Sequence, residues 1–349
     1  MRPILDRCPN HQLSKGKRRN KIETEIRQLV IDFQHHYVPE ELARQKGLYS
    51  KEVTVATEGG VPQMTLHAKL YDAEAQLKDM DAAGVDISVL SCHLGWSGSL
   101  QDCQTINDEY AKLQQRYPGR FVGLAHAPVL EGDKALAELD RAILELGLHG
   151  FTITSQVDGL FLDAPELDKF YEKATALDVP VFVHPALVPK GYDSIQGYDL
   201  PRIIGREIDL TIATIRLIAG GVLDRHPELK FVIGHFGGGI AALKDRLMAM
   251  VHRFGTIKRP FEEYLDMLYF DLSGFEGGLT AFRCAMLGIR PDRLVFATDY
   301  PQNFAGVSTI TGKGNEAIRD YVSAVRELDL ADEVKEDILG GTAARLLKL

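Results

Sequence analysis

The chain has 349 residues, of which 45% are hydrophobic and 26% charged, so it is long enough to bury one large core. Its formal net charge of -9 and its pI near 5.7 give no general attraction to phosphate backbones or anionic membranes. We therefore expect no nucleic-acid or membrane partner, and no apolar run approaches the ~20 residues that would span a bilayer. The four cysteines form no CxxC pair, which favours the reducing cytoplasm.

Residues 1–28 are polar and basic and lack the apolar stretch of a secretory signal, so we interpret them as an appended arm. A transit peptide is the alternative, but Asp6, Glu23 and Glu25 and the absence of an amphipathic stripe argue against it. No linker rich in Pro, Gly or Ser divides residues 29–349, which we predict to form a single domain.

From residue 29 onward, short aliphatic runs alternate with longer segments of helical period, the pattern of parallel strands joined by crossover helices. The eight predicted strands are Leu29–Phe33, Ile87–Ser91, Phe121–Ala125, Phe151–Thr154, Val181–Val183, Lys230–Gly234, Leu268–Leu272 and Leu294–Thr298. The predicted helices include Asn107–Arg116, Ala135–Leu146, Ala164–Leu177, Thr211–Arg225, Ile240–Val251 and Leu279–Leu287. Eight such units predict an α/β fold that closes into a (β/α)8 TIM barrel. A doubly wound open sheet competes, but no glycine-rich dinucleotide motif follows the first strand.

Histidines gather at the ends of these strands, where barrel enzymes carry their active sites. Of the eleven histidines in the chain, those that follow predicted strands are His35, His36, His93, His126, His184 and His235. Asp299 ends the eighth strand. Imidazole nitrogens and a carboxylate that converge from different strands are suitable ligands for a divalent metal ion. His93 or His126 alone is more simply a core or loop residue, but the whole set predicts a metal site.

Alternation along the first strand separates its polar residues. Side chains two positions apart point to the same side of a strand, so we predict that Gln34 and His36 face the ion while His35 is structural. His184 ends the apolar strand Val181–Val183 and is a further predicted ligand.

The last two motifs each have a simpler interpretation as well. His235 precedes three glycines that let the backbone approach a ligand, although such a sequence is also typical of a plain turn. Asp299 follows a buried apolar strand, where a carboxylate is costly without a partner and a cation would satisfy it. A helix N-cap is the alternative role for Asp299.

With these motifs in place, the chain resembles the amidohydrolase superfamily, within the branch of aminocarboxymuconate semialdehyde decarboxylase and the resorcylate-type decarboxylases. The resemblance runs from about residue 29 to residue 349, and it includes further segments at Asp79–Asp86, Asn107–Ala111, Tyr117–Phe121 and Ile338–Leu347. It implies a metal-dependent hydrolase-like barrel with ligands from the first strand, His184 and Asp299. It also implies that His235 transfers a proton and that the activity is that of a lyase.

Gln34 departs from this branch, whose members resemble one another in carrying His-x-His, Glu-x-His or Glu-x-Ala on the first strand. A carboxamide oxygen is a neutral and weaker donor, so the ion would keep more positive charge or bind less tightly. We predict one divalent metal ion per subunit, with zinc favoured and manganese as the alternative. A metal-free relic of such a site is the extreme alternative.

The resemblance implies non-oxidative decarboxylation of an aromatic or unsaturated carboxylic acid. In this hypothesis His235 protonates the carbon that bears the carboxylate, and Asp299 orients groups and balances charge. The same site would also serve a hydrolase or hydratase that uses metal-activated water, and the motifs do not separate these reactions. A third hypothesis is a barrel that binds a ligand without turnover, with Gln34 marking the lost chemistry.

The predicted substrate contacts lie on loops after the strands. His93 and Trp96 follow the second strand, and the stretch 186–210 carries Arg202 and Arg206, which suits a planar carboxylic acid as the partner. An aromatic residue such as Trp96 serves equally well in packing. Arg246 matches an arginine that in this family reaches a neighbouring subunit's active site, which implies a homodimer or tetramer. Its simpler interpretation is a solvated charge on a helix.

Overall fold

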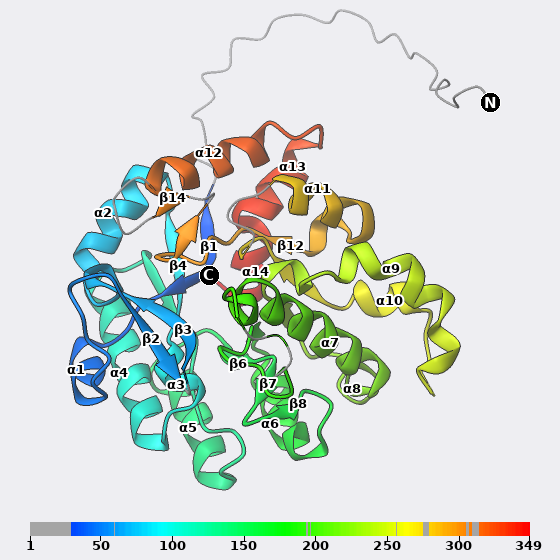
Figure 1. Ribbon diagram of the computed structural model, residues 1–349, viewed down its shortest axis with the longest axis horizontal. Helices are drawn as coiled ribbons and strands as arrows, with labels where there is room; N and C mark the ends of the chain where they lie inside the picture. The colour runs from blue at the N-terminus through cyan, green and yellow to red at the C-terminus, as the bar shows by residue number, and fades with distance from the viewer. Residues whose placement is uncertain are drawn as a thin grey trace, which may run out of the picture.

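The computed structural model describes residues 29–349 except residues 59, 193–194, 196, 256, 275–278, 305–306 and 309–313. The predicted arm of residues 1–28 lies outside the described residues. Figure 1 shows strands gathered around the centre of the view and helices arranged around them.

Parallel strands form the inner ring: β1 (Ile31–His36), β4 (Ile87–Ser91), β5 (Phe121–Gly123), β6 (Phe151–Thr154), β9 (Val181–His184), β10 (Phe231–Ile233), β11 (Tyr269–Asp271) and β12 (Leu294–Val295). Pairing gives one sheet in the order β1-β4-β5 and another in the order β12-β11-β10-β9-β6. Backbone hydrogen bonds join the two sheets at both gaps: the Ala125 amide donates to Gly150 at 2.7 Å, and the Phe33 amide donates to Phe296 at 3.0 Å. The predicted (β/α)8 TIM barrel is confirmed, and the doubly wound sheet is excluded.

The helices lie outside this ring. The longer ones are α2 (Ala73–Ala83), α4 (Leu100–Arg116), α5 (Asp133–Leu144), α6 (Asp168–Leu177), α7 (Arg206–Ala219), α9 (Ile240–Ala249), α11 (Leu279–Gly288) and α12 (Gly314–Arg326). The shorter ones are α1 (Glu40–Gln45), α3 (His93–Trp96), α8 (Val222–Arg225), α10 (Phe261–Leu265), α13 (Asp332–Glu336) and α14 (Thr342–Leu347). In the described part of the chain, no helix combines the length and the apolar character needed to cross a membrane.

Two helix boundaries differ from the prediction for local reasons. Helix α4 begins at Leu100 because Ser99 and Asp102 form a reciprocal capping box, so the helix starts well before the predicted residue 107. The single helix predicted over Thr211–Arg225 is wrong, because the chain turns at Gly221 with a φ of 71° between α7 and α8.

A β-hairpin absent from the prediction extends from the barrel between α1 and α2. It consists of β2 (Thr54–Glu58) and the antiparallel strand β3 (Val61–Leu66). Its strand β3 faces the mouth of the barrel, where Gln63, Met64 and Thr65 line the main cavity. Two shorter hairpins are formed by Gln156–Val157 with Leu160–Phe161 (β7, β8) and by Asn303–Phe304 with Val307–Ser308 (β13, β14).

An irregularity in β1 sets the directions of its side chains. Asp32 pairs with Ser88 and His35 pairs with Leu90, so two residues of β1 stand opposite one residue of β4. Such a bulge breaks strict alternation. Phe33 therefore packs inside the barrel against Phe182, with ring centroids 5.8 Å apart, while Gln34 beside it reaches the polar mouth.

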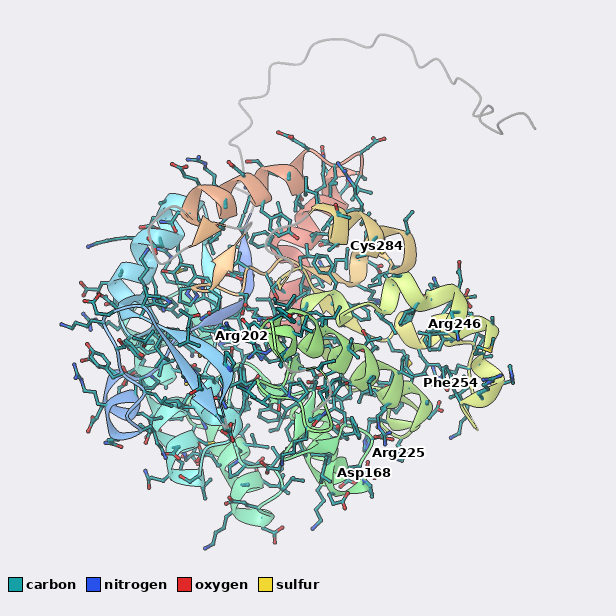
Figure 2. All side chains as sticks on the ribbon, in the orientation of Figure 1. Asp168, Arg202, Arg225, Arg246, Phe254 and Cys284 are labelled. Carbon is teal, nitrogen blue, oxygen red and sulfur yellow. The ribbon has the colours of Figure 1, made fainter. Side chains whose placement is uncertain are left out.

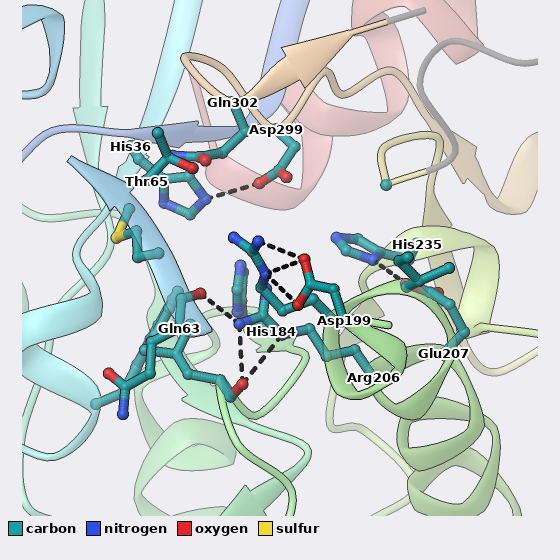
Figure 3. A pocket seen from close by; sticks show the side chains of 16 residues that line it. His36, Gln63, Thr65, His184, Asp199, Arg206, Glu207, His235, Asp299 and Gln302 are labelled. Atoms are coloured by element: carbon teal, nitrogen blue, oxygen red, sulfur yellow. Dashed lines mark hydrogen bonds and ion pairs between the residues drawn. The ribbon is translucent and has the colours of Figure 1, made fainter. Parts of the chain in front are cut away.

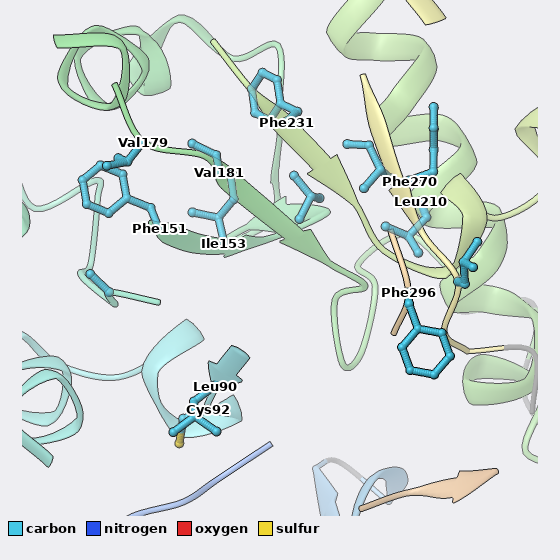
Figure 4. Close-up of a cluster of buried hydrophobic side chains, with 14 of the residues drawn as sticks. Leu90, Cys92, Phe151, Ile153, Val179, Val181, Leu210, Phe231, Phe270 and Phe296 are labelled. Atoms are coloured by element: carbon cyan, nitrogen blue, oxygen red, sulfur yellow. The ribbon is translucent and has the colours of Figure 1, made fainter. Parts of the chain in front are cut away.

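Apolar side chains cover both faces of the strands, as expected for a parallel sheet buried on both sides. The cluster inside the barrel contains Phe33, Phe182 and Val232, all fully buried. The larger cluster lies between strands and helices and includes Phe231 and Phe270, both drawn in Figure 4. The protein is thus held by two apolar layers that leave the mouth of the barrel for polar groups.

We expect Gly123→Ala to destabilise the protein. An added Cβ at Gly123 in β5 would lie 2.7 Å from the Tyr110 Cβ and 2.9 Å from the Leu148 Cδ2, so a close strand–helix contact would have to open. The cost of such overpacking is about 1–3 kcal/mol, measured by chemical or thermal unfolding. Gly239→Ala is the matched control, because its added Cβ would meet its nearest neighbour at an ordinary 3.7 Å. Equal stability of the two variants would contradict the close packing.

Candidate metal centre and active site

A cavity of about 560 Å³ opens at the carboxyl ends of the strands (Figure 3). Several side chains predicted from the sequence line it, together with groups from the β2–β3 hairpin and from the start of α7. The lining includes His36, Trp96, His184, Arg206, His235 and Asp299. A volume in this range suits a small organic ligand.

Three potential metal ligands meet in this cavity. His36 at the end of β1, His184 at the end of β9 and Asp299 after β12 each offer a ligand atom, and these atoms lie within 4.8 Å of one another. The His184 Nδ1 lies 2.8 Å from the Pro185 carbonyl oxygen, to which it donates, so the Nε2 lone pair is left for an ion. Burial holds the pKa of His184 well below its usual range, which keeps the imidazole neutral, as a ligand must be.

Asp299 supplies the negative charge of this group. Burial alone would raise its pKa, but the hydrogen bond with His36 and the charges of the neighbouring histidines outweigh burial and hold it well below its usual range. The Asp299 Oδ1 lies 2.8 Å from the His36 Nε2. The backbone of Asp299 is left-handed, with a φ of 61°, a strained conformation of the kind found where a side chain must be aimed precisely. Two imidazoles and one carboxylate form a donor set that fits a divalent ion.

Gln34 links the ligand group to His235. Its Nε2 donates to the Asp299 Oδ1 at 2.7 Å and lies 3.2 Å from the His235 Nε2. Its Oε1 accepts a hydrogen bond from the Ser273 hydroxyl at 2.8 Å. In this orientation the amide nitrogen, and not the oxygen, faces the ligand atoms. Ligation by Gln34 would require the amide to turn over, and it stays a prediction.

His235 is held by one contact at its ring and another at its backbone amide. Its Nδ1 lies 2.8 Å from the Glu207 Oε1, and its backbone amide donates to the Asp271 Oδ1 at 2.8 Å. Burial alone would lower the pKa of His235, but the carboxylate of Glu207, with those of Asp299 and Asp271, raises it to about 9. At neutral pH this imidazole holds a proton close to the predicted ligands.

Glycine makes room for this imidazole. A Cβ added to Gly274 would lie 2.2 Å from the His235 ring, and the φ of Gly274 is 80°. His235 and Phe236 themselves have positive φ values of 51° and 55°. Backbone strain of this kind is concentrated at functional sites.

The predicted substrate-binding residues fall in three different places. Trp96 lines the cavity and stacks on His184, with ring centroids 4.0 Å apart, and its Nε1 donates to the Thr152 hydroxyl at 3.0 Å. His93 is buried and is absent from the described lining of the cavity. Arg246 is exposed on α9 at the periphery of the molecule, away from the cavity of its own chain (Figure 2).

His35 and His126 have structural contacts. His35 lies 3.2 Å from Asp32 and from Gln76 on its two ring nitrogens and stacks on Tyr300, outside the cavity lining. The His126 Nε2 accepts a hydrogen bond from the Cys92 amide. His35 agrees with the simpler interpretation of a satisfied buried histidine, whereas the buried Nδ1 of His126 has no hydrogen-bond partner among the described residues.

The sequence prediction missed Glu207 and Asp271 as neighbours of His235. Glu207 stands at the start of α7, and Asp271 ends β11, one strand beyond His235. Asp271 had a usable signal, because it is an acidic residue at the carboxyl end of an apolar strand, as Asp299 is. Glu207 had none, because nothing local in the sequence relates the first turn of α7 to the end of β10.

Comparison with known proteins places this site in a family. A family model described as amidohydrolase matches residues 31–349. A 2-amino-3-carboxymuconate-6-semialdehyde decarboxylase from Dictyostelium discoideum is 29% identical over 299 residues, which are 81% of this chain and 79% of the relative.

Two solved structures have the same fold. That of 5-carboxyvanillate decarboxylase from Sphingomonas paucimobilis has a TM-score of 0.76 at 24% identity and covers 92% of this chain and 99% of its own. That of dihydroxybenzoic acid decarboxylase from Polaromonas, with bound manganese and the inhibitor 2-nitroresorcinol, has a TM-score of 0.72 at 22% identity, covering 92% and 97%. The match of the family model to nearly the whole described chain confirms the predicted resemblance: the chain belongs to the amidohydrolase family.

Proposed function

We propose that this protein is a metal-dependent, non-oxidative decarboxylase of an aromatic or unsaturated carboxylic acid. The observation that carries the proposal is the meeting of His36, His184 and Asp299 within 4.8 Å of one another, beside a proton-holding His235. The decarboxylase named among its relatives supports this reaction over hydrolysis or hydration.

We infer that His36, His184 and Asp299 hold one divalent ion, with Gln34 as a further candidate ligand. When bound, such an ion would act as a Lewis acid and template for a carboxylate or hydroxyl oxygen of the substrate. Zinc suits the two imidazole nitrogens, and the manganese in the Polaromonas structure supports manganese as the alternative. The Ser91 hydroxyl, 3.2 Å from the His36 Nδ1, and the Pro185 carbonyl orient the two imidazoles.

His235 is the proposed proton donor. Its Nε2 would carry the proton once the Gln34 amide, whose nitrogen faces it at 3.2 Å, has turned over. This proton would pass to the substrate carbon that bears the carboxylate, after which the bond to the carboxylate breaks and carbon dioxide leaves. The electron pair of the broken bond stays with the organic product. Glu207 orients the ring through Nδ1 and stabilises its protonated form, and Asp299 balances charge and orients His36 and Gln34.

Substrate contacts beyond these groups are proposed from three residues. Trp96 offers an aromatic face at the wall of the cavity. His93 is buried near His36 and outside the described lining, so we propose that it acts on the substrate through the ligand group. We also propose that Arg246 acts on the cavity of a neighbouring subunit in a homodimer or tetramer, since it is exposed on α9 and is absent from the described lining of its own cavity. The free state of the described cysteines Cys92, Cys103 and Cys284 is compatible with the proposed cytoplasmic location.

The test of this function is a panel of hydroxybenzoates and muconate-like acids incubated with the metal-loaded protein. We expect release of carbon dioxide from at least one of them, followed by a coupled bicarbonate assay and by loss of the substrate's ultraviolet absorbance. Lactones and amides form the comparison panel, because a hydrolase with the same site would use metal-activated water on them. Cleavage of these compounds without carbon dioxide release from any acid would refute the decarboxylase.

We expect about one equivalent of zinc or manganese per subunit in the purified protein, and a large loss of this metal in His184→Ala. The substitution removes one of the three ligands that meet in the cavity. Metal content is measured by mass spectrometry after dialysis. His252→Ala, on an exposed histidine of a short 3-10 turn, is the control and should keep its metal. A folded wild-type protein that takes up no metal from a supplemented medium would contradict the proposed centre.

Glu207→Gln should lower kcat by about 10-fold to 1000-fold with a smaller change in KM, because the imidazole loses the carboxylate that orients it and favours its protonated form. Steady-state kinetics on the substrate identified by the panel separate the two parameters. Glu172→Gln, a matching substitution of an exposed residue on α6, should leave both unchanged. An unaltered kcat in Glu207→Gln would exclude this positioning role.

A further inference from the structure

Arg206 is a fixed cation in the wall of the cavity. It is the first residue of α7, and its guanidinium donates from Nη2 to the Gln63 carbonyl at 2.6 Å and to the Leu187 carbonyl at 2.9 Å. Its Nε donates to the same Leu187 carbonyl at 3.2 Å. Figure 3 shows the side chain reaching from α7 to these two carbonyls, within the group of residues that lines the cavity.

No carboxylate among the described residues is hydrogen-bonded or ion-paired with Arg206, whose hydrogen-bond partners are neutral carbonyl oxygens. Its neighbour Arg202 lines the same cavity but is bound by both oxygens of Asp199, with Nε at 2.8 Å and 2.9 Å. Burial lowers the pKa of Arg206 to about 10, and the charges of the Asp299, Glu207 and Asp199 carboxylates offset only part of this effect. Arg202 is therefore ion-paired directly with a carboxylate, whereas Arg206 is hydrogen-bonded only to carbonyl groups.

The balance of charge in the cavity points the same way. With a divalent ion held as proposed, Asp299 would offset one of its charges, and Arg202 is already paired with Asp199. Arg206 would then add a positive charge to which no described carboxylate is hydrogen-bonded, and a ligand whose one carboxylate lies at the ion would leave this charge unmatched. A half-buried cation without a counter-charge is costly, so a second anionic group on the ligand would stabilise the complex.

We propose that Arg206 binds a second carboxylate of the substrate, so that the substrate class is an aromatic or unsaturated dicarboxylic acid. The inference rests on the proposed function. One carboxylate would lie between the metal ligands and His235 and leave as carbon dioxide. The other would lie against the guanidinium, whose Nη1 is not used by the Gln63 or Leu187 carbonyl and can donate a charge-assisted hydrogen bond, and would stay on the product. A cavity of about 560 Å³ has room for a single ring with two such groups.

The test is a comparison of two ligands that the protein cannot turn over readily, benzene-1,3-dicarboxylate and benzoate, on the metal-loaded full-length protein. Binding is followed by the fluorescence of Trp96, which is the only tryptophan in the chain and lines the same cavity, and by calorimetry. We expect the wild type to prefer the dicarboxylate by about 10-fold to 100-fold, the range of a charge-assisted hydrogen bond. Arg206→Gln should bring this ratio close to one by weakening the dicarboxylate alone.

Two further variants separate contact from general electrostatics. The double variant Arg202→Gln, Asp199→Asn removes a neutral ion pair from the same wall and should keep the preference. Arg206→Lys keeps the positive charge but loses the planar guanidinium that the two carbonyls hold. This variant should keep only part of the preference for the dicarboxylate. Benzoate affinity is the internal reference for intact folding in every variant.

The inference is overturned if the wild type shows no preference, or if Arg206→Gln weakens both ligands equally. A preference for the dicarboxylate that depends on Arg206, without carbon dioxide release from any acid, would refute the proposed decarboxylase activity but support the anion site at Arg206. Rapid decarboxylation of monocarboxylic acids that is unaffected by Arg206→Gln would refute the proposed dicarboxylic substrate class and leave the proposed decarboxylase activity supported.

Discussion

The carboxylate of Asp299 is the interaction on which the mouth of the barrel depends. It is half-buried, ionised and in contact with groups from β1, at 2.8 Å from the His36 Nε2 and 2.7 Å from the Gln34 Nε2. Its own backbone amide also donates to the Gln34 carbonyl oxygen, at the seam where β1 meets the segment after β12. A half-buried anion of this kind is stabilised by such partners, so the contacts that close the barrel at this seam also position the ligand group.

The bulge in β1 reconciles two demands on that strand. The interior of the barrel requires apolar side chains, which Phe33 supplies, while the mouth requires polar ones directly above them. In a regular strand Phe33 and Gln34 would point to opposite faces. With the extra residue they share a side, so the strand passes from the apolar interior of the barrel to its polar mouth within one residue.

Much of this protein could be predicted from its sequence, because parallel strands and their carboxyl-terminal residues leave a strong local pattern. The runs ending in His184 and His235 located both the barrel and the cavity, and Asp299 stood out as an acid at the end of an apolar strand. Interactions between distant segments left no such pattern: Glu207 meets His235 across a helix start, and the β2–β3 hairpin brings Gln63 to Arg206. The side of Gln34 that faces the ligands depends on Ser273, which is equally distant in the chain.

The anchoring of Arg206 has a consequence for how this scaffold can diversify. Its guanidinium is set by carbonyls of the β2–β3 hairpin and of the loop after β9, whereas the ligand group is set by β1, β9 and the segment after β12. Selectivity and reactivity are thus encoded in largely separate stretches of chain. A lengthened or retwisted hairpin would redirect the cation while the histidines and Asp299 keep their places, so new acids could be accepted without rebuilding the reaction centre.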